Sequence, residues 1–509
     1  MKKALPVILI LFTLFNYAQE YEITSFTNIN GGSSDFESEL ENEDWFGHSV
    51  EGIGDLDGDG VADIAIGANQ DDDGGFNKGA IYIAFLNEDT TIKDVQKISD
   101  TEGNFTADLL DWDYFGRSIA YLGDLNDDGL VEIAVSAEYD NEAGHRYGGI
   151  YIISLESNGT VASYQKINEI HGNFTGDLDV WDVFGSDIEN IGDLNGDGTI
   201  DIAVGARRDG DGGDQRGAVW ILFLNEDFTV KEHQKISELE GNLNLSLEFQ
   251  DYFGATITNL GDLNEDGVID LAVGAYRDDD GGNNKGALYI LFMASDGTVL
   301  STQKISEVEG NFNEELLEDV RFGRSTNLTD DINQDGKPDL IVGCQRNHFY
   351  ILNLNSDGTV DSFEKYGEGL QGFDYDLGED DYFGHSVSTV GYLNGTLHLA
   401  VGAYGDSEFG LQKGAVWLLN LDRTLSSEQN FSRNKNIVVY PNPTDRSFRL
   451  SSANTSGDVK IHTMSGNLVK IFNFQINNEY DVSNLSSGTY LVSFITVDGN
   501  YNTVQLIVK

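Results

Sequence analysis

The chain has 509 residues, of which 59 are Gly and only 4 are Pro, and 39% of its side chains are hydrophobic, enough to bury a large core. Its 87 acidic residues against 30 basic ones give a formal charge of −57 at pH 7. A field of this sign repels phosphate backbones and anionic lipid surfaces, which argues against nucleic-acid binding and electrostatic membrane attachment and makes cations the natural partners.

The first residues carry the pattern of a secretory signal peptide. Lys2 and Lys3 precede an apolar run from Ala4 to Phe15, and the small residue Ala18 follows. The run is too short to span a bilayer, so we expect a signal peptide over residues 1–18 that is cleaved after Ala18. No later run is apolar and long enough for a transmembrane segment, and none is expected.

A Phe-Gly pair then recurs six times at a nearly fixed interval. Five copies are spaced by 69 residues and the sixth follows after 61, at Phe46-Gly47, Phe115-Gly116, Phe184-Gly185, Phe253-Gly254, Phe322-Gly323 and Phe383-Gly384. A period of this length is typical of a unit that buries its apolar face only by stacking on copies of itself. The repeat therefore decides the fold class.

The first copy contains four short runs with strand character. They are Phe46 to Val50, Ile64 to Ala68, Gly79 to Leu86 and Val95 to Ser99, bounded by Gly and Asp clusters. These runs predict four antiparallel strands, and four strands repeated radially form a propeller blade. The single cysteine, Cys344, stands where other copies have Ala, which indicates a buried small side chain and excludes an intramolecular disulfide.

The Phe-Gly pair followed by an acidic loop and a small-residue triplet, which is Gly67-Ala68-Asn69 in the first copy, resembles the FG-GAP repeat of the integrin α-subunit β-propeller, over residues 22–425. The resemblance implies an all-β propeller of FG-GAP blades. We expect six blades, because Ile23 to Ile29 occupy the phase of the fourth strand that the last copy lacks. Integrin propellers have seven, so a degenerate seventh blade is the alternative.

Five copies contain a loop in which side-chain oxygens recur at positions 1, 3, 5 and 9, with Gly at position 6. Alternate residues converge their oxygens on one point, and the position-7 carbonyl adds a ligand, as a hard cation requires. The side chains are Asp55, Asp57, Asp59, Asp63; Asp124, Asn126, Asp128, Glu132; Asp193, Asn195, Asp197, Asp201; Asp262, Asn264, Asp266, Asp270; Asp331, Asn333, Asp335 and Asp339. The carbonyls are those of Val61, Leu130, Thr199, Val268 and Lys337.

These loops open like an EF-hand loop but end at position 9 before a strand, so they resemble the calcium loop of integrin propellers. We expect about five Ca²⁺ ions, since the sixth copy has lost the carboxylates around Asn394. The longer Glu132 puts the affinity of the second site in question. The alternative is a metal-free hairpin turn, because Asp and Asn favour turns in any case.

By analogy with integrins, the opposite face would carry the ligand. Its loops are acidic and aromatic, and the candidate ligand-binding residues are Trp45, Trp112, Tyr114, Trp181 and Tyr252. An Asp stands two residues before the Phe in five copies, at Asp44, Asp113, Asp182, Asp251 and Asp381, where it either caps a turn or joins that face. The leading function is adhesion or binding of an extracellular protein or glycan, with no catalysis. A polysaccharide hydrolase or lyase using rim carboxylates is the rival.

A polar linker over residues 426–436 leads to a small β-sandwich over residues 437–509. Its Pro441-Asn442-Pro443 start, the entry Leu485-Ser486-Ser487-Gly488-Thr489-Tyr490 and the end at Lys509 resemble a type IX secretion system C-terminal sorting domain. That resemblance implies handling by the type IX secretion machinery, and a protein released from, or anchored at, the surface of a Gram-negative bacterium. An ordinary adhesive sandwich is the alternative.

Overall fold

The computed structural model describes residues 20–33, 36, 39–329, 331–332, 336–393 and 395–424, and in the C-terminal part 439–440, 444, 446–450, 455–463, 468–473, 480–486, 488–496 and 501–509. Every regular element in these ranges is a strand. The chain divides into two compact units, Met1–Thr424 and Leu425–Lys509. The predicted signal peptide and the linker lie outside the described residues.

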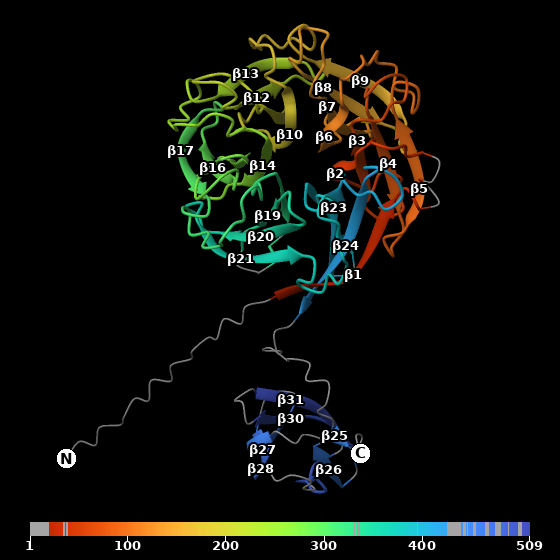
Figure 1. Cartoon of the computed structure of the whole chain (residues 1–509), viewed down its shortest axis with the longest axis vertical. Coiled ribbons are helices and arrows are strands. Elements are labelled where there is room, and N and C mark those ends of the chain that lie inside the picture. The colour runs from red at the N-terminus through yellow and green to blue at the C-terminus, as the bar shows by residue number, and fades with distance from the viewer. Residues whose placement is uncertain are drawn as a thin grey trace, which may run out of the picture. The chain divides into compact units, whose positions relative to one another are not determined.

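The first unit consists of six four-stranded antiparallel sheets arranged around a ring (Figure 1). The first blade contains β2 (Phe46–Gly54), β3 (Asp63–Ala68), β4 (Ala80–Leu86) and β5 (Ile92–Ile98). The second contains β6 (Phe115–Gly123), β7 (Val131–Ala137), β8 (Gly149–Leu155) and β9 (Val161–Ile167). The third contains β10 (Phe184–Gly192), β11 (Asp201–Ala206), β12 (Ala218–Leu224) and β13 (Val230–Ile236).

The remaining blades repeat this order, with one exception in the last. The fourth contains β14 (Thr256–Gly261), β15 (Asp270–Ala275), β16 (Ala287–Met293) and β17 (Val299–Ile305). The fifth contains β18 (Ser325–Thr329), β19 (Asp339–Gly343), β20 (His348–Leu354) and β21 (Val360–Gly367). The sixth contains β22 (Ser386–Leu393), β23 (Thr396–Ala403), β24 (Ala415–Thr424) and the N-terminal β1 (Glu20–Asn30) as its outer strand.

Strand β1 closes the ring. It pairs antiparallel with β24, with Ile29 opposite Val416 and Ile23 opposite Leu421, as the sequence phase predicts. The inner strands β2, β6, β10, β14, β18 and β22 contact one another in order, and β22 returns to β2. A bridge between Phe46 and Gly414 joins the first blade directly to the sixth. Six blades thus complete the circle, and no place remains for a seventh.

The Phe-Gly repeat joins each blade to the next. All six of its Phe side chains are fully buried. Phe115, for example, packs among Ile81 and Ile83 of the first blade and Tyr151 of its own. Gly67 of the small-residue triplet faces the Gly116 carbonyl so closely that an added Cβ would lie 2.1 Å from its oxygen. Glycine is required here because the neighbouring backbone takes the space of a side chain.

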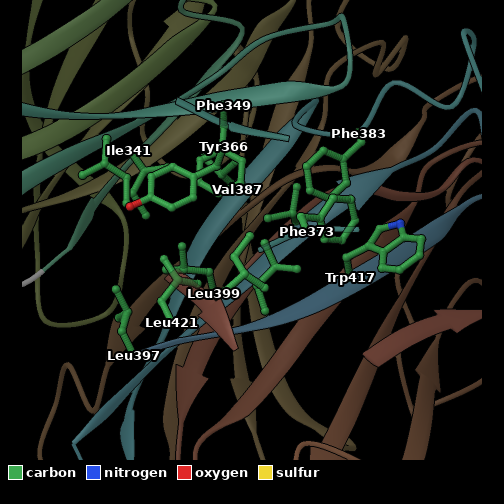
Figure 2. Packing of buried hydrophobic residues seen from close by; sticks show 14 of the residues in the cluster. Ile341, Phe349, Tyr366, Phe373, Phe383, Val387, Leu397, Leu399, Trp417 and Leu421 are labelled. Atoms are coloured by element: carbon green, nitrogen blue, oxygen red, sulfur yellow. The ribbon is translucent and has the colours of Figure 1, made fainter. Parts of the chain in front are cut away.

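The contact between the fifth and sixth blades is built the same way, from buried aromatic and aliphatic side chains (Figure 2). Phe349 of β20, Phe383 at the sixth Phe-Gly and Trp417 of β24 all belong to one buried cluster. Phe373 stacks on Phe383 at 5.0 Å and meets Trp417 edge-on at 5.3 Å. Burying rings of this size stabilises the closing blade by about 1.5–3 kcal/mol each.

The C-terminal unit is a small β-sandwich. One sheet contains β25 (Val439–Tyr440), β26 (Ser447–Leu450) and β29 (Tyr480–Asp481). The other contains β28 (Leu468–Asn473), β27 (Thr455–Thr463), β30 (Gly488–Thr496) and β31 (Tyr501–Val508), in that order. Phe448 and Tyr480 from the first sheet pack with Ile461, Val492 and Leu506 from the second.

The described residues contain no helix that is long and apolar enough to cross a membrane.

Candidate metal loops and ligand face

The acidic loops lie at one end of the blades, in the hairpin between the inner strand and the second strand. In the first blade, Gly54 pairs with Asp63 at the loop end, and Phe46 pairs with Ala68 at the other end. The loop therefore occupies one face of the ring, and the residues after Phe-Gly and after the small-residue triplet occupy the opposite face. In the sixth blade Leu393 pairs directly with Thr396, so its hairpin is too short for such a loop.

The first loop is folded around its own carboxylates. Asp55 accepts hydrogen bonds from the amides of Gly58 at 2.8 Å and Asp59 at 2.9 Å with one oxygen, and from Gly60 at 2.8 Å with the other. Asp63 accepts from the amides of Leu56 at 3.0 Å and Leu86 at 3.0 Å. One oxygen each of Asp55, Asp57 and Asp63 lie within 4.8 Å of one another, a spacing that one cation can bridge.

The same scaffold recurs in the next three blades. The position-1 carboxylate accepts from the amides at positions 5 and 6, with distances of 2.8–3.0 Å for Asp124, Asp193 and Asp262. In the fifth loop, Asp331 accepts from Gly336 at 2.7 Å and Asp339 from Ile332 at 2.9 Å. Asn333 and Asp335 lie outside the described residues. The ligand roles of the position-7 carbonyls stay a prediction.

The position-9 carboxylates are buried. Asp63, Glu132, Asp201, Asp270 and Asp339 are at most 1% exposed. Burial raises the pKa of Asp63, Asp201 and Asp270 to about 6, and it also raises the pKa of Glu132. A buried carboxylate is costly as an anion unless a positive charge compensates it. The donor set, hard oxygens around a buried acid, therefore fits a hard divalent cation.

Lysine side chains reach two of the loops. Lys93 Nζ lies 2.6 Å from Asp57 and 2.5 Å from Asp59, and Lys231 Nζ lies 2.8 Å from Asp197. Both follow the first residue of the blade's outer strand. The corresponding residues of the second and fourth blades are Ala162 and Leu300. A lysine ammonium group thus pairs with the carboxylates of the first and third loops, and the second and fourth loops have no lysine at this position.

A second set of acidic loops is neutralised by the lysine of the Gln-Lys-Ile strand. Lys97 lies 3.0 Å from Asp71 and 3.5 Å from Asp73. Lys235 pairs with Asp209 and Asp211, and Lys304 with Asp278 and Asp280, at 2.7–2.9 Å. These acids already have a positive partner, which explains why lysine recurs in that strand.

The aspartates two residues before the Phe cap a turn. Asp113 accepts a hydrogen bond from the Leu110 amide at 2.8 Å, and Asp182 accepts from the Asp179 amide at 2.7 Å. Asp44, Asp251 and Asp381 do the same at 2.5–2.7 Å. This is the turn-capping arrangement that one of the two interpretations of these residues expects.

The aromatic residues of the opposite face differ in exposure. Trp112 is 44% exposed and stacks on Phe76 at 5.4 Å, and Trp181 is 38% exposed beneath the guanidinium of Arg146 at 4.1 Å. Trp45 stacks on His48 at 5.8 Å, and Tyr114 meets Tyr139 at 4.9 Å. Tyr252 is 4% exposed, packed against Tyr276 and Arg277. A cleft of about 540 Å³ lies beside Trp112, lined by residues 141–146.

A further group of residues lies on this face, at the centre of the ring, and none of the sequence motifs indicates a role for it. The third residue of each small-residue triplet lines the mouth of the central channel; these are Asn69, Glu138, Arg207, Tyr276, Gln345 and Tyr404. They are joined there by residues that follow Phe-Gly, namely His48, Arg117, Arg324 and His385. The signal that could have found them is that these positions change chemistry from blade to blade while their neighbours repeat.

Comparison with protein families agrees with this architecture. Residues 46–83 match the model of the FG-GAP repeat, and residues 438–509 match that of the secretion system C-terminal sorting domain. The chain thus contains an FG-GAP repeat and a secretion system C-terminal sorting domain, and it is similar to integrin α subunits. A domain of this kind implies handling by the type IX secretion machinery and indicates a secreted or cell-surface protein.

Integrin α subunits are among the relatives of this FG-GAP protein. It is 33% identical to integrin alpha-3 of Cricetulus griseus over 165 residues, which is 32% of this chain and 14% of the integrin. It is 35% identical to integrin alpha-11 of Homo sapiens over 167 residues, 32% of this chain and 13% of the integrin. Integrin alpha-5 of Xenopus laevis is 31% identical over 244 residues, 47% of this chain and 20% of the integrin. The alignments thus span a fifth or less of each integrin.

A chain of the crystal structure of BBS1N in complex with ARL6DN, soaked with mercury, aligns over 80% of the FG-GAP protein and 99% of that chain, with a TM-score of 0.39 and 11% identity.

Proposed function

We propose that this protein is a calcium-binding β-propeller, exported to the cell surface or the medium, that binds an extracellular protein or glycan without catalysis. The observation that carries the proposal is the acidic hairpin loop, which recurs with one hydrogen-bond scaffold in successive blades of a propeller that ends in a sorting domain. The integrin likeness supports a binding role.

We further propose four segments: a signal peptide over residues 1–18, the propeller over 22–425, a linker over 426–436 and the sorting domain over 437–509. Deleting residues 437–509 should leave a periplasmic protein that never reaches the surface or medium. An internal deletion within the linker, which keeps both folded units, is the control. Normal surface display of the truncated protein would contradict the sorting role.

Calcium would be held by the oxygens at positions 1, 3, 5, 7 and 9 of the first five loops, about five ions in all. An ion that binds only the folded chain stabilises it by about 2.7 kcal/mol per site at a free concentration one hundred times the dissociation constant. Excess chelator should therefore lower the melting temperature by many degrees, and calcium should restore it. An unchanged melting curve together with no metal in elemental analysis would overturn this part of the proposal.

A matched pair of variants separates ligation from charge. Asp124→Asn and Asp127→Asn each remove one negative charge from the second loop, but only Asp124 stands at a ligand position. We expect the first to weaken calcium binding by about tenfold and the second to change it by less than about threefold, because Asp127 is exposed and acts only through the screened field. Equal effects would argue for a general electrostatic attraction without a defined site.

The exposed tryptophans mark the rim surface for the ligand. Trp112 borders the cleft of about 540 Å³, and Trp181 lies beneath Arg146, which also lines that cleft. Exposed aromatic side chains of this kind are enriched where proteins bind partners. Binding of the calcium-loaded protein to a glycan and matrix-protein array should be lost in a Trp112→Ala, Trp181→Ala variant. Cleavage of any polysaccharide by the purified protein would favour the rival hydrolase or lyase.

A further inference from the structure

The mouth of the central channel, on the face opposite the acidic loops, differs in charge from the rest of the protein. It is a cavity of about 320 Å³ at the centre of the ring. Arg117, Arg207 and Arg324 line it, and each is only 6–7% exposed. Three buried cations at one point are unusual in a chain whose formal charge is −57. Such a cluster is costly unless negative charge meets it.

The side chains around the cavity supply less negative charge than the arginines require. The one carboxylate among the lining residues is Glu138, whose oxygens lie 2.8 Å from Arg207 Nη2 and 3.4 Å from Arg117 Nε. Arg324 has no carboxylate partner in this cavity: its Nη2 lies 2.7 Å from His385 Nε2, and its guanidinium lies over the Tyr276 ring at 4.9 Å. Subtracting one glutamate from the three buried arginines leaves two positive charges, and Arg146 and Arg321, which also line the cavity, add to this excess.

The histidines do not alter this balance. Burial and the neighbouring arginines hold the pKa of His48 and of His385 well below the usual range, so both are neutral at physiological pH. Burial, followed by repulsion from Arg117, lowers the pKa of Arg324 to about 9, which still leaves it charged. Glu51, Asp187 and Glu189 line the adjoining part of the channel beside Arg117 and Arg324, and burial raises the pKa of all three, which reduces the negative charge that they supply. Positive charge therefore remains in excess at the mouth at neutral pH.

Two donors of one arginine at the mouth also have no acceptor. Nε and Nη1 of Arg207 are buried without a hydrogen-bond partner among the described residues. A buried charged donor without an acceptor costs more than a neutral one, because charge-assisted hydrogen bonds are the stronger kind. The mouth thus has more charged donors than its one carboxylate, Glu138, can accept from.

The shape and the walls of the cavity indicate the class of anion. Guanidinium groups bind carboxylates through two parallel hydrogen bonds. Tyr139, Tyr276, Tyr404 and Trp45 line the same cavity and place aromatic side chains beside the charge. A volume of about 320 Å³ suits a small molecule. A long polyanion would be repelled by the acidic remainder of the protein, so an isolated carboxylate on an uncharged body fits best.

We propose that the channel mouth binds a small ligand with a single carboxylate on a sugar ring, that is, a uronic acid residue. Its carboxylate meets Arg207 and Arg324, and its ring packs against the tyrosines. This names a ligand class for the binding role proposed above and rests on that role, but it places the ligand at the centre of the ring instead of at the tryptophans of the rim.

The test is calorimetric titration of the full-length secreted protein, in calcium, with sodium glucuronate and with glucose. We expect binding of glucuronate and none of glucose, and a loss of at least about tenfold in affinity for Arg324→Gln. This variant leaves Glu138 with both of its arginines, so its melting temperature should be unchanged or higher. Arg346→Gln removes an exposed arginine outside the cavity and should bind glucuronate as the parent does.

Other results would overturn the proposal. Equal binding of glucose, or an unaltered affinity for glucuronate in Arg324→Gln, would exclude the anion site. If Arg324→Gln fails to fold, Arg207→Lys, which keeps the charge but loses the planar fork, must weaken glucuronate binding. Tighter binding of an acidic peptide than of glucuronate would reject the sugar. Calcium-dependent melting, or loss of array binding in the tryptophan variant, would leave the calcium and rim proposals standing even if glucuronate fails.

Discussion

Arg207 reaches from the third blade to the second, where its Nη2 lies 2.8 Å from Oε2 of Glu138, a residue 69 positions earlier in the chain. The two residues occupy the same place in successive repeats, as the third residue of the small-residue triplet. Equivalent positions of two neighbouring blades thus carry opposite charges, and these charges form an ion pair across the boundary between the blades. An ion pair of this kind joins neighbouring blades at the channel mouth as well as setting its charge.

Replacing the acid of that pair should destabilise the propeller strongly. Glu138→Gln leaves Arg117 and Arg207 buried without a carboxylate, and breaking a buried pair in this way costs about 3–5 kcal/mol. The free energy of unfolding from denaturant titration measures the loss. Glu142→Gln is the control: its side chain is 42% exposed, so loss of its contact with Lys166 should cost at most about 1 kcal/mol. Equal effects of the two variants would contradict the role given to Glu138.

The acids within the channel predict that stability falls as the pH rises. Burial raises the pKa of Glu51 from 4.5 to about 7, and burial also holds the pKa of Glu189 well above its usual range. A carboxyl whose pKa is raised in the fold contributes stability that is complete below about pH 4.5 and is lost as the pH rises through about 7. The groups facing the same channel are Asp187, Arg117, Arg324, His48 and His385.

Melting temperatures between pH 5 and pH 8 should therefore decrease, and a Glu51→Gln, Glu189→Gln variant should flatten the curve over that range. Glu156→Gln, on an exposed loop, should leave the slope as it is. A slope that is the same in the double variant and in the parent would place the responsible groups elsewhere, since the buried Asp44, Asp113 and Asp182 also have pKa values raised to about 7.

The fold could be predicted from the sequence because its blades recur at a fixed interval along the chain. The Phe-Gly spacing predicted the blades. The last copy lacks an outer strand, which predicted that residues Ile23–Ile29 supply it, and these residues pair with β24. Both features are local patterns of apolar residues and glycine, and such patterns determine which surfaces must be buried. The acidic loops could be located for the same reason, since their oxygens lie close together in the chain.

The channel mouth could not be predicted in this way. Its residues come from all six blades, and five different residue types occupy the one repeated position, with tyrosine in the fourth and sixth blades, so no motif spans them. The lysines of the Gln-Lys-Ile strands were equally hidden, because Lys97 and its partner Asp71 are separated by 26 residues and meet only once the blade is folded. Charge pairs between residues far apart in the chain depend on the folded blades and on the ring that they form, and no local sequence pattern reports them.

Cys344 should not react with thiol reagents in the folded protein. It is fully buried in the position that holds Ala68 in the first blade, and burial raises the pKa of its thiol. The thiolate is the reactive form, so a thiol reagent should label Cys344 only after the chain unfolds in denaturant. Cys344→Ala should cost about 1 kcal/mol or less, because alanine fits this site in the other blades. Rapid labelling under native conditions would show that the fifth blade opens.

Lys93 should weaken calcium binding to the first loop. Its ammonium group lies 2.6 Å from Asp57 and 2.5 Å from Asp59, two of the proposed ligands, and an ion entering that loop must displace it. Lys93→Gln should raise the calcium affinity of the first loop about twofold to fivefold, the range expected for an exposed ion pair. Titration calorimetry at low salt measures the change, which should shrink at high salt because the pair is screened.

The second loop provides the reciprocal variant. Ala162 occupies the place that Lys93 takes in the first blade, since each follows the residue that opens the outer strand, Val161 or Ile92. Ala162→Lys should therefore weaken calcium binding to the second loop by a similar factor, and it should do so without lowering the melting temperature of the calcium-free protein. If Lys93→Gln left the affinity unchanged at low salt, or if Ala162→Lys raised it, the lysine would be a surface neighbour of the loop and not a competitor of the ion.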